Sequence, residues 1–197
     1  MTTAGSVSSP VRVLTPAALL VMLSLPMLMA TGCSTADALR ATDKKIDLPR
    51  FMGDWYVIGS IPIDFFFVSE AGAHNAVESY ALNEDGSIDT RYRFRKDSFD
   101  GPVKSFNPTG FVYNTETNAE WRMQFLWPFK SAYLIVYLAD DYSSTIIGVP
   151  NRDYIWIMAR SPDISEEEYQ KLLDISAAAG YDLDKIVRIP HQWPEPE

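Results

Sequence analysis

The sequence predicts an all-β protein: an eight-stranded antiparallel up-and-down β-barrel with one C-terminal α-helix packed outside it. Three observations support this prediction. Apolar and polar residues alternate with period two through most of residues 53–160, as in strands that bury one face. Turn-forming residues separate these runs, and the spacing becomes helical only after Pro162. Antiparallel strands with short links favour a closed barrel, because closure removes unpaired edges.

The predicted strands follow in chain order. The first runs to residue 61 and leads into an apolar loop at 62–68, and the second, 73–82, ends at a hairpin signal, Asn83-Glu84-Asp85-Gly86. The third has an uncharged face (Ile88, Thr90, Tyr92, Phe94) and a charged face (Asp89, Arg91, Arg93, Arg95). The fourth, 103–113, contains Pro108, which predicts a bulge or bend. A fifth strand is predicted to end near residue 127. Three more are predicted at residues 133–139, 143–149 and 154–160.

The C-terminal part predicts one helix. Ser165 with Glu168 forms a capping box, the glutamates at 166–168 suit a helix N-terminus, and Gly180 is a typical stop. A short strand at 186–189 is expected to follow. Residues 191–197 are rich in proline and are expected to form a loose tail.

The N-terminal 32 residues have the pattern of a secretory signal peptide. Arg12 is the only charge before Asp37, residues 13–30 are mostly apolar, and small residues precede Cys33. The alternative is an uncleaved membrane anchor, although Pro16 and Pro26 interrupt the apolar run.

The segment Ala30-Thr31-Gly32-Cys33 resembles the bacterial lipobox, in which the cysteine is acylated and becomes the mature N-terminus. Ser34 after it implies delivery to the outer membrane by the sorting rule of that class. The predicted organisation is a signal peptide (1–32), a lipidated N-terminus and tether (33–49), a barrel with its helix (50–190) and the tail (191–197). The protein would face the periplasm. Cys33 is the only cysteine, so no intramolecular disulfide can form.

The net charge of −9 and pI of about 4.7 argue against nucleic acid as a partner, because phosphates would repel such a surface. They also argue against purely electrostatic docking on anionic lipid.

Three short motifs, taken in order on this β pattern, resemble the lipocalin signature. They are Gly53-Asp54-Trp55 at the start of the first strand, Asp141-Tyr142 before a late strand, and Arg160 at the end of the last. The resemblance extends over residues 49–190 and is closest to bacterial outer-membrane lipocalins, plant temperature-induced lipocalins and apolipoprotein D. It implies that Trp55 and Arg160 pack together and close one end of the barrel, and that an apolar small molecule binds inside.

Strand parity predicts the cavity lining. Side chains that share the inward face with Trp55 and Arg160, together with the apolar loop at the expected mouth, are Val57, Phe65, Phe66, Phe67, Glu78, Tyr80, Tyr92, Phe94, Trp121, Met123, Phe125, Tyr154, Trp156 and Met158. For each aromatic residue, plain packed core is the alternative. Glu78 is expected either near the mouth, favouring a zwitterionic headgroup over a free fatty acid, or as a solvated rim residue.

Catalytic and metal-binding patterns are not evident. His74 and His191 are isolated and interpreted as surface residues, there is no nucleophile elbow or Cys–His pair, and no metal or cofactor is predicted. The predicted function is that of a non-enzymatic, lipid-anchored protein that binds or carries fatty acids or lysophospholipids, and the family resemblance implies a role in envelope maintenance or stress. Two alternatives remain: a lipid-modifying enzyme or isomerase, and a filled scaffold that docks a membrane protein. The sequence leaves the choice between monomer and homodimer open.

Overall fold

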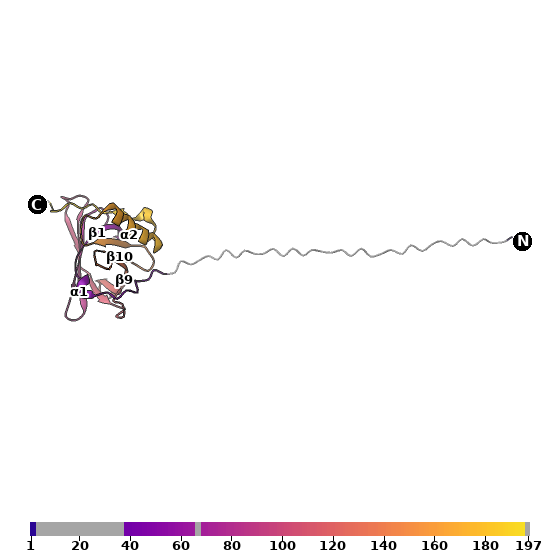
Figure 1. Cartoon of the computed structure of the whole chain (residues 1–197), viewed down its shortest axis with the longest axis horizontal. Coiled ribbons are helices and arrows are strands. Elements are labelled where there is room, and N and C mark those ends of the chain that lie inside the picture. The colour runs from indigo at the N-terminus through magenta and orange to yellow at the C-terminus, as the bar shows by residue number, and fades with distance from the viewer. Residues whose placement is uncertain (3–37, 66–67, 196–197) are drawn as a thin grey trace. The chain divides into compact units, whose positions relative to one another are not determined.

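The computed structural model describes residues 1–2, 38–65 and 68–195 (Figure 1). The predicted signal peptide, Cys33, Phe66 and Phe67 lie outside the described residues. The chain divides into two units, residues 1–36 and 37–197, and all the elements below belong to the second.

The elements are, in chain order, α1 (Leu48–Phe51), β1 (Gly53–Ile61), β2 (Asp64–Phe65), β3 (Val68–Ser69), β4 (Ala73–Leu82), β5 (Ser87–Lys96), β6 (Val103–Phe106), β7 (Thr109–Val112), β8 (Glu120–Leu126), β9 (Phe129–Leu138), β10 (Ser144–Gly148), β11 (Ile155–Ala159), α2 (Glu166–Ala178), the 3₁₀ turn η1 (Leu183–Lys185) and β12 (Val187–Arg188).

Antiparallel strands close into a barrel with eight strand positions, which confirms the predicted fold class. The strand order is β11-β10-β9-β8-β7-β5-β4-β1, and β11 pairs with β1 to close the sheet. β6 and β7 share one position beside β5. Asn107 and Pro108 separate them, because proline has no N–H to donate to the ladder. The short β12 pairs outside β1, and β2 pairs with β3 in a separate hairpin.

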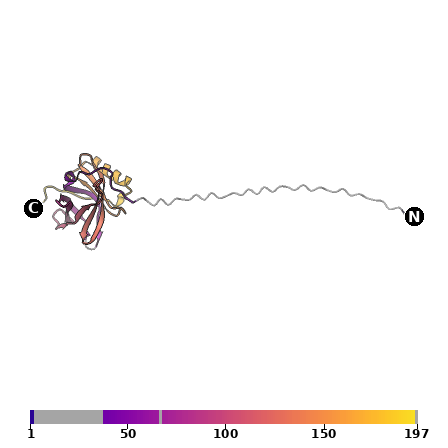
Figure 2. The same cartoon turned by 90° about the horizontal axis from the view of Figure 1, so that it is seen from below.

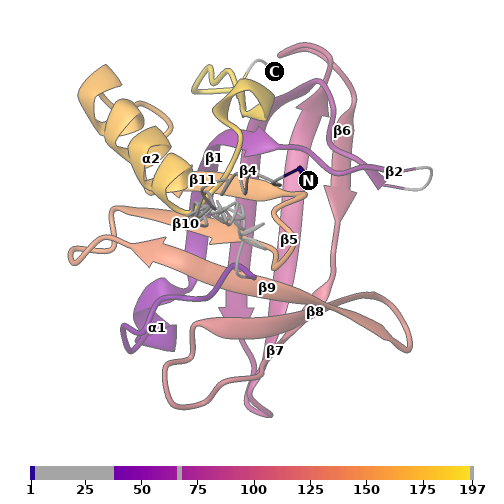
Figure 3. The same cartoon turned by 90° about the vertical axis from the view of Figure 1, so that its right-hand side faces the viewer.

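Burial along β5 follows the predicted alternation. Ile88, Thr90, Tyr92 and Phe94 are buried, whereas Asp89 and Arg91 are exposed. In contrast, all five residues of β10 and of β11 are buried, because α2 covers the outer face of these strands (Figures 2 and 3). Leu172 of α2 packs in one apolar cluster with Ile146 and Ile157. The helix therefore adds a second hydrophobic layer to one side of the barrel.

The helix α2 begins and ends as predicted. Ser165 is the N-cap, and its hydroxyl accepts a hydrogen bond from the Glu168 backbone N–H at 3.1 Å. Three glutamates occupy the first turn, where they interact favourably with the helix dipole. Gly180 follows the helix with φ +88°, a conformation in which a Cβ atom would be strained.

Replacing Ser165 with alanine should lower the free energy of unfolding by about 1 kcal/mol, because the Glu168 N–H loses its partner. Thermal denaturation followed by circular dichroism should show a fall in Tm of about 2–4 °C. Ser105 is exposed on β6, so Ser105→Ala is the matched control. Equal shifts for both variants would show that the cap contributes nothing.

The segment expected to be a tether packs against the barrel from residue 38 onward. The Leu39 N–H donates to the Pro150 carbonyl at 3.0 Å, and the Ile46 N–H donates to the Thr117 carbonyl at 2.7 Å. Leu39 is 7% exposed and Ile46 is 1% exposed. Two buried apolar side chains hold this strap, residues 38–47, in place, so this part of the predicted tether belongs to the folded unit.

The C-terminal segment is also less free than predicted, because residues 190–195 make contacts with the barrel. Arg93 donates two hydrogen bonds to the Glu195 carboxylate, at 2.5 and 2.8 Å, and Arg95 lies 3.1 Å from it. Trp193 packs edge-to-face on Tyr56 with ring centroids 5.3 Å apart. The outward arginines of β5 thus provide the partners of this segment.

Candidate ligand-binding site

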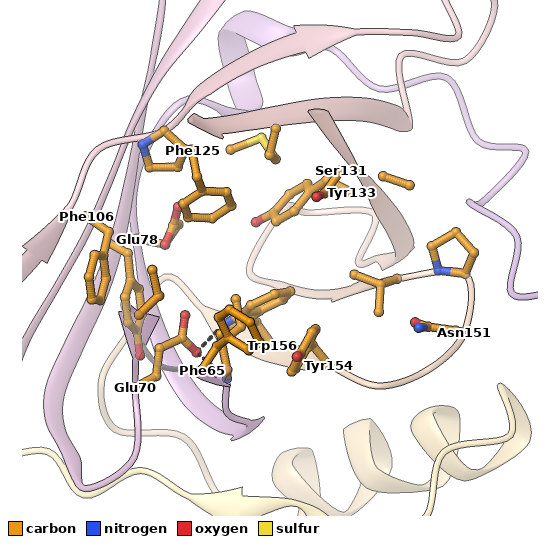
Figure 4. A pocket seen from close by; sticks show the side chains of 18 residues that line it. Phe65, Glu70, Glu78, Phe106, Phe125, Ser131, Tyr133, Asn151, Tyr154 and Trp156 are labelled. Atoms are coloured by element: carbon orange, nitrogen blue, oxygen red, sulfur yellow. Dashed lines mark hydrogen bonds between the residues drawn. The ribbon is translucent and has the colours of Figure 1, made fainter. Parts of the chain in front are cut away.

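A cavity of about 620 Å³ occupies the inside of the barrel. It lies toward the end where β1 finishes and β11 begins, beside the β2–β3 hairpin and the turn that follows β10 (Figure 4). The eighteen lining residues are Ile63, Phe65, Val68, Glu70, Glu78, Tyr92, Phe106, Pro108, Met123, Phe125, Ser131, Ala132, Tyr133, Val149, Pro150, Asn151, Tyr154 and Trp156. Most are apolar or aromatic, and none is Lys, Arg or His.

The opposite end of the barrel is closed by Trp55 and Arg160. The Arg160 guanidinium lies 3.7 Å from the centroid of the Trp55 ring. Its nitrogens donate to the backbone carbonyls of Asp54, Phe51 and Met52 at 2.7–2.9 Å, and to that of Arg50 at 3.1 Å. The arginine therefore fastens α1 and the start of β1 across the barrel end. This contact is the one that the sequence motif implied.

The Asp141-Tyr142 turn holds the same end from the other side. The Asp141 carboxylate accepts hydrogen bonds from the backbone N–H and the hydroxyl of Ser143 at 3.0 and 2.6 Å. The Tyr142 hydroxyl accepts from the Asp47 N–H at 2.9 Å, and Arg50 stacks on the Tyr142 ring at 4.0 Å. The turn thus fixes the end of the strap and α1 over the barrel.

Two carboxyl groups face the cavity interior (Figure 4). Glu70, just after β3, accepts hydrogen bonds on Oε2 from the Ile63 N–H at 3.2 Å and from Trp156 Nε1–H at 3.1 Å. Burial raises its pKa from 4.5 to about 7, although these two hydrogen bonds oppose the rise. Glu70 therefore changes protonation near neutral pH.

Glu78, on β4, is the second carboxyl group. It is 7% exposed and has no hydrogen-bond partner among the described residues. Burial, and then the nearby Glu70 carboxyl, raise its pKa well above the ordinary value. Glu78 is opposite Trp55 in the β1–β4 ladder, and Trp55 lies at the closed end of the barrel. Glu78 therefore lies deep in the barrel, neither near the mouth nor on a solvated rim, because β4 runs from the open end toward the closed end.

The family of the chain follows from comparison with known proteins. The lipocalin-like domain profile matches residues 46–191. The chain belongs to the lipocalin family. Temperature-induced lipocalin-1 of Arabidopsis thaliana is 27% identical, with 78% of this chain and 84% of the relative covered. The outer membrane lipoprotein Blc of Escherichia coli K12 is 26% identical, with 81% and 88% covered. Bovine apolipoprotein D is 27% identical, with 73% and 76% covered.

Solved structures show the same fold. Insecticyanin from the tobacco hornworm Manduca sexta superposes with a TM-score of 0.60 at 14% identity, covering 81% of this chain and 87% of that one. The cockroach allergen Per a 4 superposes with a TM-score of 0.59 at 16% identity, covering 80% and 96%. These likenesses support the lipocalin barrel alone.

The structure brings seven of the fourteen sequence-predicted lining residues to the cavity wall of this lipocalin. These are Phe65, Glu78, Tyr92, Met123, Phe125, Tyr154 and Trp156. Five others, Val57, Tyr80, Phe94, Trp121 and Met158, belong to the packed core and do not line the cavity. Strand alternation identifies the inward face of a strand but not how far along the barrel axis a side chain lies. Neighbouring aromatic rings fill the space around several of these five residues. Phe66 and Phe67 lie outside the described residues.

Sequence reasoning missed Glu70 and Tyr133 at the site. Glu70 follows a two-residue strand in the apolar loop, where no period identifies an inward side chain. Tyr133 lies in β9 directly opposite Trp121. Residues opposite each other in a ladder point to the same face of the sheet, so the inward prediction for Trp121 applied to Tyr133 as well. The turn at 149–151 also lines the cavity, and a turn carries no inward periodicity.

Three buried tyrosines, Tyr80, Tyr92 and Tyr133, add hydroxyl groups to this region. Tyr80 and Tyr133 share a hydrogen bond between their hydroxyl groups. The Tyr92 hydroxyl has no partner among the described residues although it is fully buried. Burial raises the pKa of Tyr92 well above its usual value, and the nearby Glu70 and Glu78 raise it further. A buried hydroxyl without a partner costs about 1–3 kcal/mol, and Tyr92 is one of the residues that line the cavity.

Exposed apolar side chains surround the mouth of the cavity. Phe65 is 68% exposed and Phe125 is 49% exposed, and both line the cavity as well. In the turn between β8 and β9, Leu126, Trp127 and Phe129 are each more than 70% exposed. Large apolar side chains exposed beside a cavity favour a contact with lipid or with another protein.

The two histidines lie away from the cavity lining. His191 is half-buried, not a surface residue as predicted, and its Nε2 lies 2.9 Å from the Val57 carbonyl. Burial lowers its pKa. Among the described residues, no group of three or more His, Cys, Asp or Glu side chains is arranged to hold a metal ion. In the same part of the chain, no helix has the length and apolarity needed to cross a bilayer.

Proposed function

We propose that this lipocalin binds one fatty acid or lysophospholipid molecule, with the acyl chain inside the barrel, and carries it without chemical change. The observation that supports this most strongly is the cavity of about 620 Å³ with mostly apolar walls. Small-molecule sites typically measure about 300–1,000 Å³ and combine apolar walls with a few polar groups. The Trp55–Arg160 contact closes the other end, so a chain would enter from the mouth.

The proposal includes attachment to the periplasmic side of the bacterial outer membrane through acylated Cys33. The lipobox-like segment before Cys33 supports it, as do relatives named outer membrane lipoproteins. Several acyl chains would hold the protein firmly, because each buried CH₂ contributes about 0.8 kcal/mol. The apolar rim at the mouth, with Trp127 at its tip, would then meet a bilayer from which lipid is taken.

Attachment at Cys33 predicts that the mature protein carries acyl chains there. Mass spectrometry of the N-terminal peptide from protein expressed in a bacterial host should show this modification. Cys33→Ser should move the protein from the membrane fraction to the soluble fraction. An unmodified Cys33, or unchanged fractionation of the variant, would contradict the anchor.

Narrowing the cavity should weaken ligand binding without unfolding the barrel. Ser131 lines the cavity opposite Met123 in the β8–β9 ladder, so Ser131→Trp places an indole in the space proposed for the acyl chain. We expect the affinity for a fluorescent fatty acid to fall at least about tenfold, or about 1.4 kcal/mol. Fluorescence titration measures it.

The matched control is Ser105→Trp, because Ser105 is exposed on β6. Equal affinity in both variants would show that the probe binds outside the barrel. Ligand recovered chemically unchanged after incubation would support carriage, whereas turnover would favour the enzyme alternative.

A further inference from the structure

The ionisable side chains that line the cavity are all acids, either carboxyl groups or phenols, and its other polar side chains, Ser131, Asn151 and Trp156, are neutral. Glu70, Glu78 and Tyr92 all line it, and no Lys, Arg or His is among the eighteen lining residues. A carboxylate ligand would therefore find acids and no cation at its polar end. Desolvating an anion beside such groups is unfavourable, so the cavity wall disfavours the ionised form of a fatty acid.

Each of the three groups has hydrogen-bonding capacity to spare. Only Oε2 of Glu70 accepts from the protein, and Oε1 has no partner among the described residues. Within the same part of the chain, the carboxyl group of Glu78 and the hydroxyl of Tyr92 are also unpaired. Glu78 and Tyr92 are opposite each other in the β4–β5 ladder. Glu70 lines the same cavity, and its carboxyl group raises the pKa of both Glu78 and Tyr92.

A primary ammonium group matches this arrangement, because it has three N–H donors and no acceptor. We propose that Glu70, Glu78 and Tyr92 form a subsite for a protonated amine, so that the preferred ligand is an amphiphile with one aliphatic chain and a single ammonium head. The inference rests on the proposed binding of an amphiphile inside the barrel, and it ranks an ammonium headgroup above the carboxylate of a fatty acid.

The surroundings of the subsite also suit a cation. Trp156, Tyr154 and Tyr133 form an aromatic wall around the two carboxyl groups (Figure 4). Aromatic faces attract a desolvated ammonium through their ring quadrupoles. One ionised carboxylate neutralises the ligand's charge, and the second carboxyl, protonated, still offers a carbonyl oxygen. The bound pair is therefore electrically neutral.

Binding of an amine should depend on pH because it needs one ionised carboxylate. Glu70 is the group that ionises first, and the groups that face it are Glu78 from β4, Tyr92 from β5, Tyr133 from β9, and Tyr154 and Trp156 at the start of β11. Below a pKa of about 7 for Glu70, affinity for the amine should fall by about tenfold for each unit of pH. Affinity for a neutral alcohol of the same chain should stay constant.

The test compares three headgroups on one chain: dodecylamine, dodecanol and dodecanoate, each displacing a neutral apolar fluorescent probe from the full-length protein. At pH 7 we expect dodecylamine to bind at least about tenfold more tightly than dodecanol, and dodecanoate to bind more weakly than both. Glu70→Gln and Glu78→Gln should each remove most of the amine preference and leave dodecanol binding within about twofold. Tyr92→Phe should weaken amine binding by a smaller factor.

Glu84→Gln is the matched control, because Glu84 is exposed in the turn after β4; it removes one acid and should change nothing. Circular dichroism confirms that each variant is folded. Equal affinities for the three headgroups, or an amine preference that survives both glutamine variants, would overturn the amine subsite. If neither the probe nor dodecanol binds the wild-type protein, the proposed binding function itself fails, which is a distinguishable result.

Discussion

Arg160→Ala is expected to lower the free energy of unfolding by about 3 kcal/mol. The side chain makes four hydrogen bonds to backbone carbonyls and stacks on Trp55. Truncation removes these four hydrogen bonds, although Trp55 Nε1–H still donates to the Phe51 carbonyl, and it removes a cation–π contact of about 0.5–2 kcal/mol. Urea denaturation followed by tryptophan fluorescence measures the loss, and Tm should fall by about 6–12 °C.

Two further substitutions make this result specific. Arg160→Lys keeps the charge but replaces a planar fork of donors with a point charge, so it should give an intermediate loss. Arg91 is exposed on the outer face of β5, and Arg91→Ala should change stability by less than about 0.5 kcal/mol. A loss at Arg160 no larger than the loss at Arg91 would mean that the closed end is held by apolar packing alone.

Stability should fall as pH rises through the range 5–8, because the folded protein holds a proton on Glu70 that the unfolded chain releases. The pKa of Glu70 is about 7 in the folded state against 4.5 for an unburied glutamate. Its stabilising contribution is therefore complete below pH 4.5 and is lost as pH approaches 7. The difference corresponds to at most about 3 kcal/mol. Glu78, whose pKa is also raised, acts in the same direction.

Glu70→Gln isolates this contribution, because the amide oxygen can still accept from Ile63 N–H and Trp156 Nε1–H. Urea unfolding at pH 5 and pH 8 should show a smaller fall for the variant, by about 2–3 kcal/mol. His191, whose pKa is lowered by burial, acts in the opposite direction but is common to both proteins and cancels in the comparison. Parallel pH profiles would show that Glu70 is ionised and solvated throughout.

Much of the fold could be predicted because local pattern and global structure agree. The two faces of β5 follow directly from alternation, Pro108 marks the interruption between β6 and β7, and Ser165 marks the start of α2. The strap and the C-terminal segment could not be predicted in this way. Leu39 and Ile46 are isolated apolar residues in a polar stretch, and the salt bridges of Glu195 with Arg93 and Arg95 join residues about a hundred positions apart.

Strand alternation predicts which side chains point into the barrel, but not which of these line the cavity and which are packed in the core. Period two places Tyr92, Trp121 and Met123 on inward faces, yet Trp121 is enclosed by other aromatic rings while the other two line the cavity. Which inward side chain meets empty space depends on the volumes of its neighbours from several strands. Glu70 comes from an irregular loop, so its place in the cavity is a consequence of tertiary structure.

The central claim is that the barrel holds a single amphiphile in its cavity of about 620 Å³. Native mass spectrometry of the protein purified from a bacterial host, combined with lipid extraction, tests it most directly. We expect one co-purifying amphiphile per barrel, absent from Ser131→Trp and present in Ser105→Trp. A wild-type barrel that carries no lipid, and that also takes up neither a fluorescent fatty acid nor a long-chain amine, would contradict it.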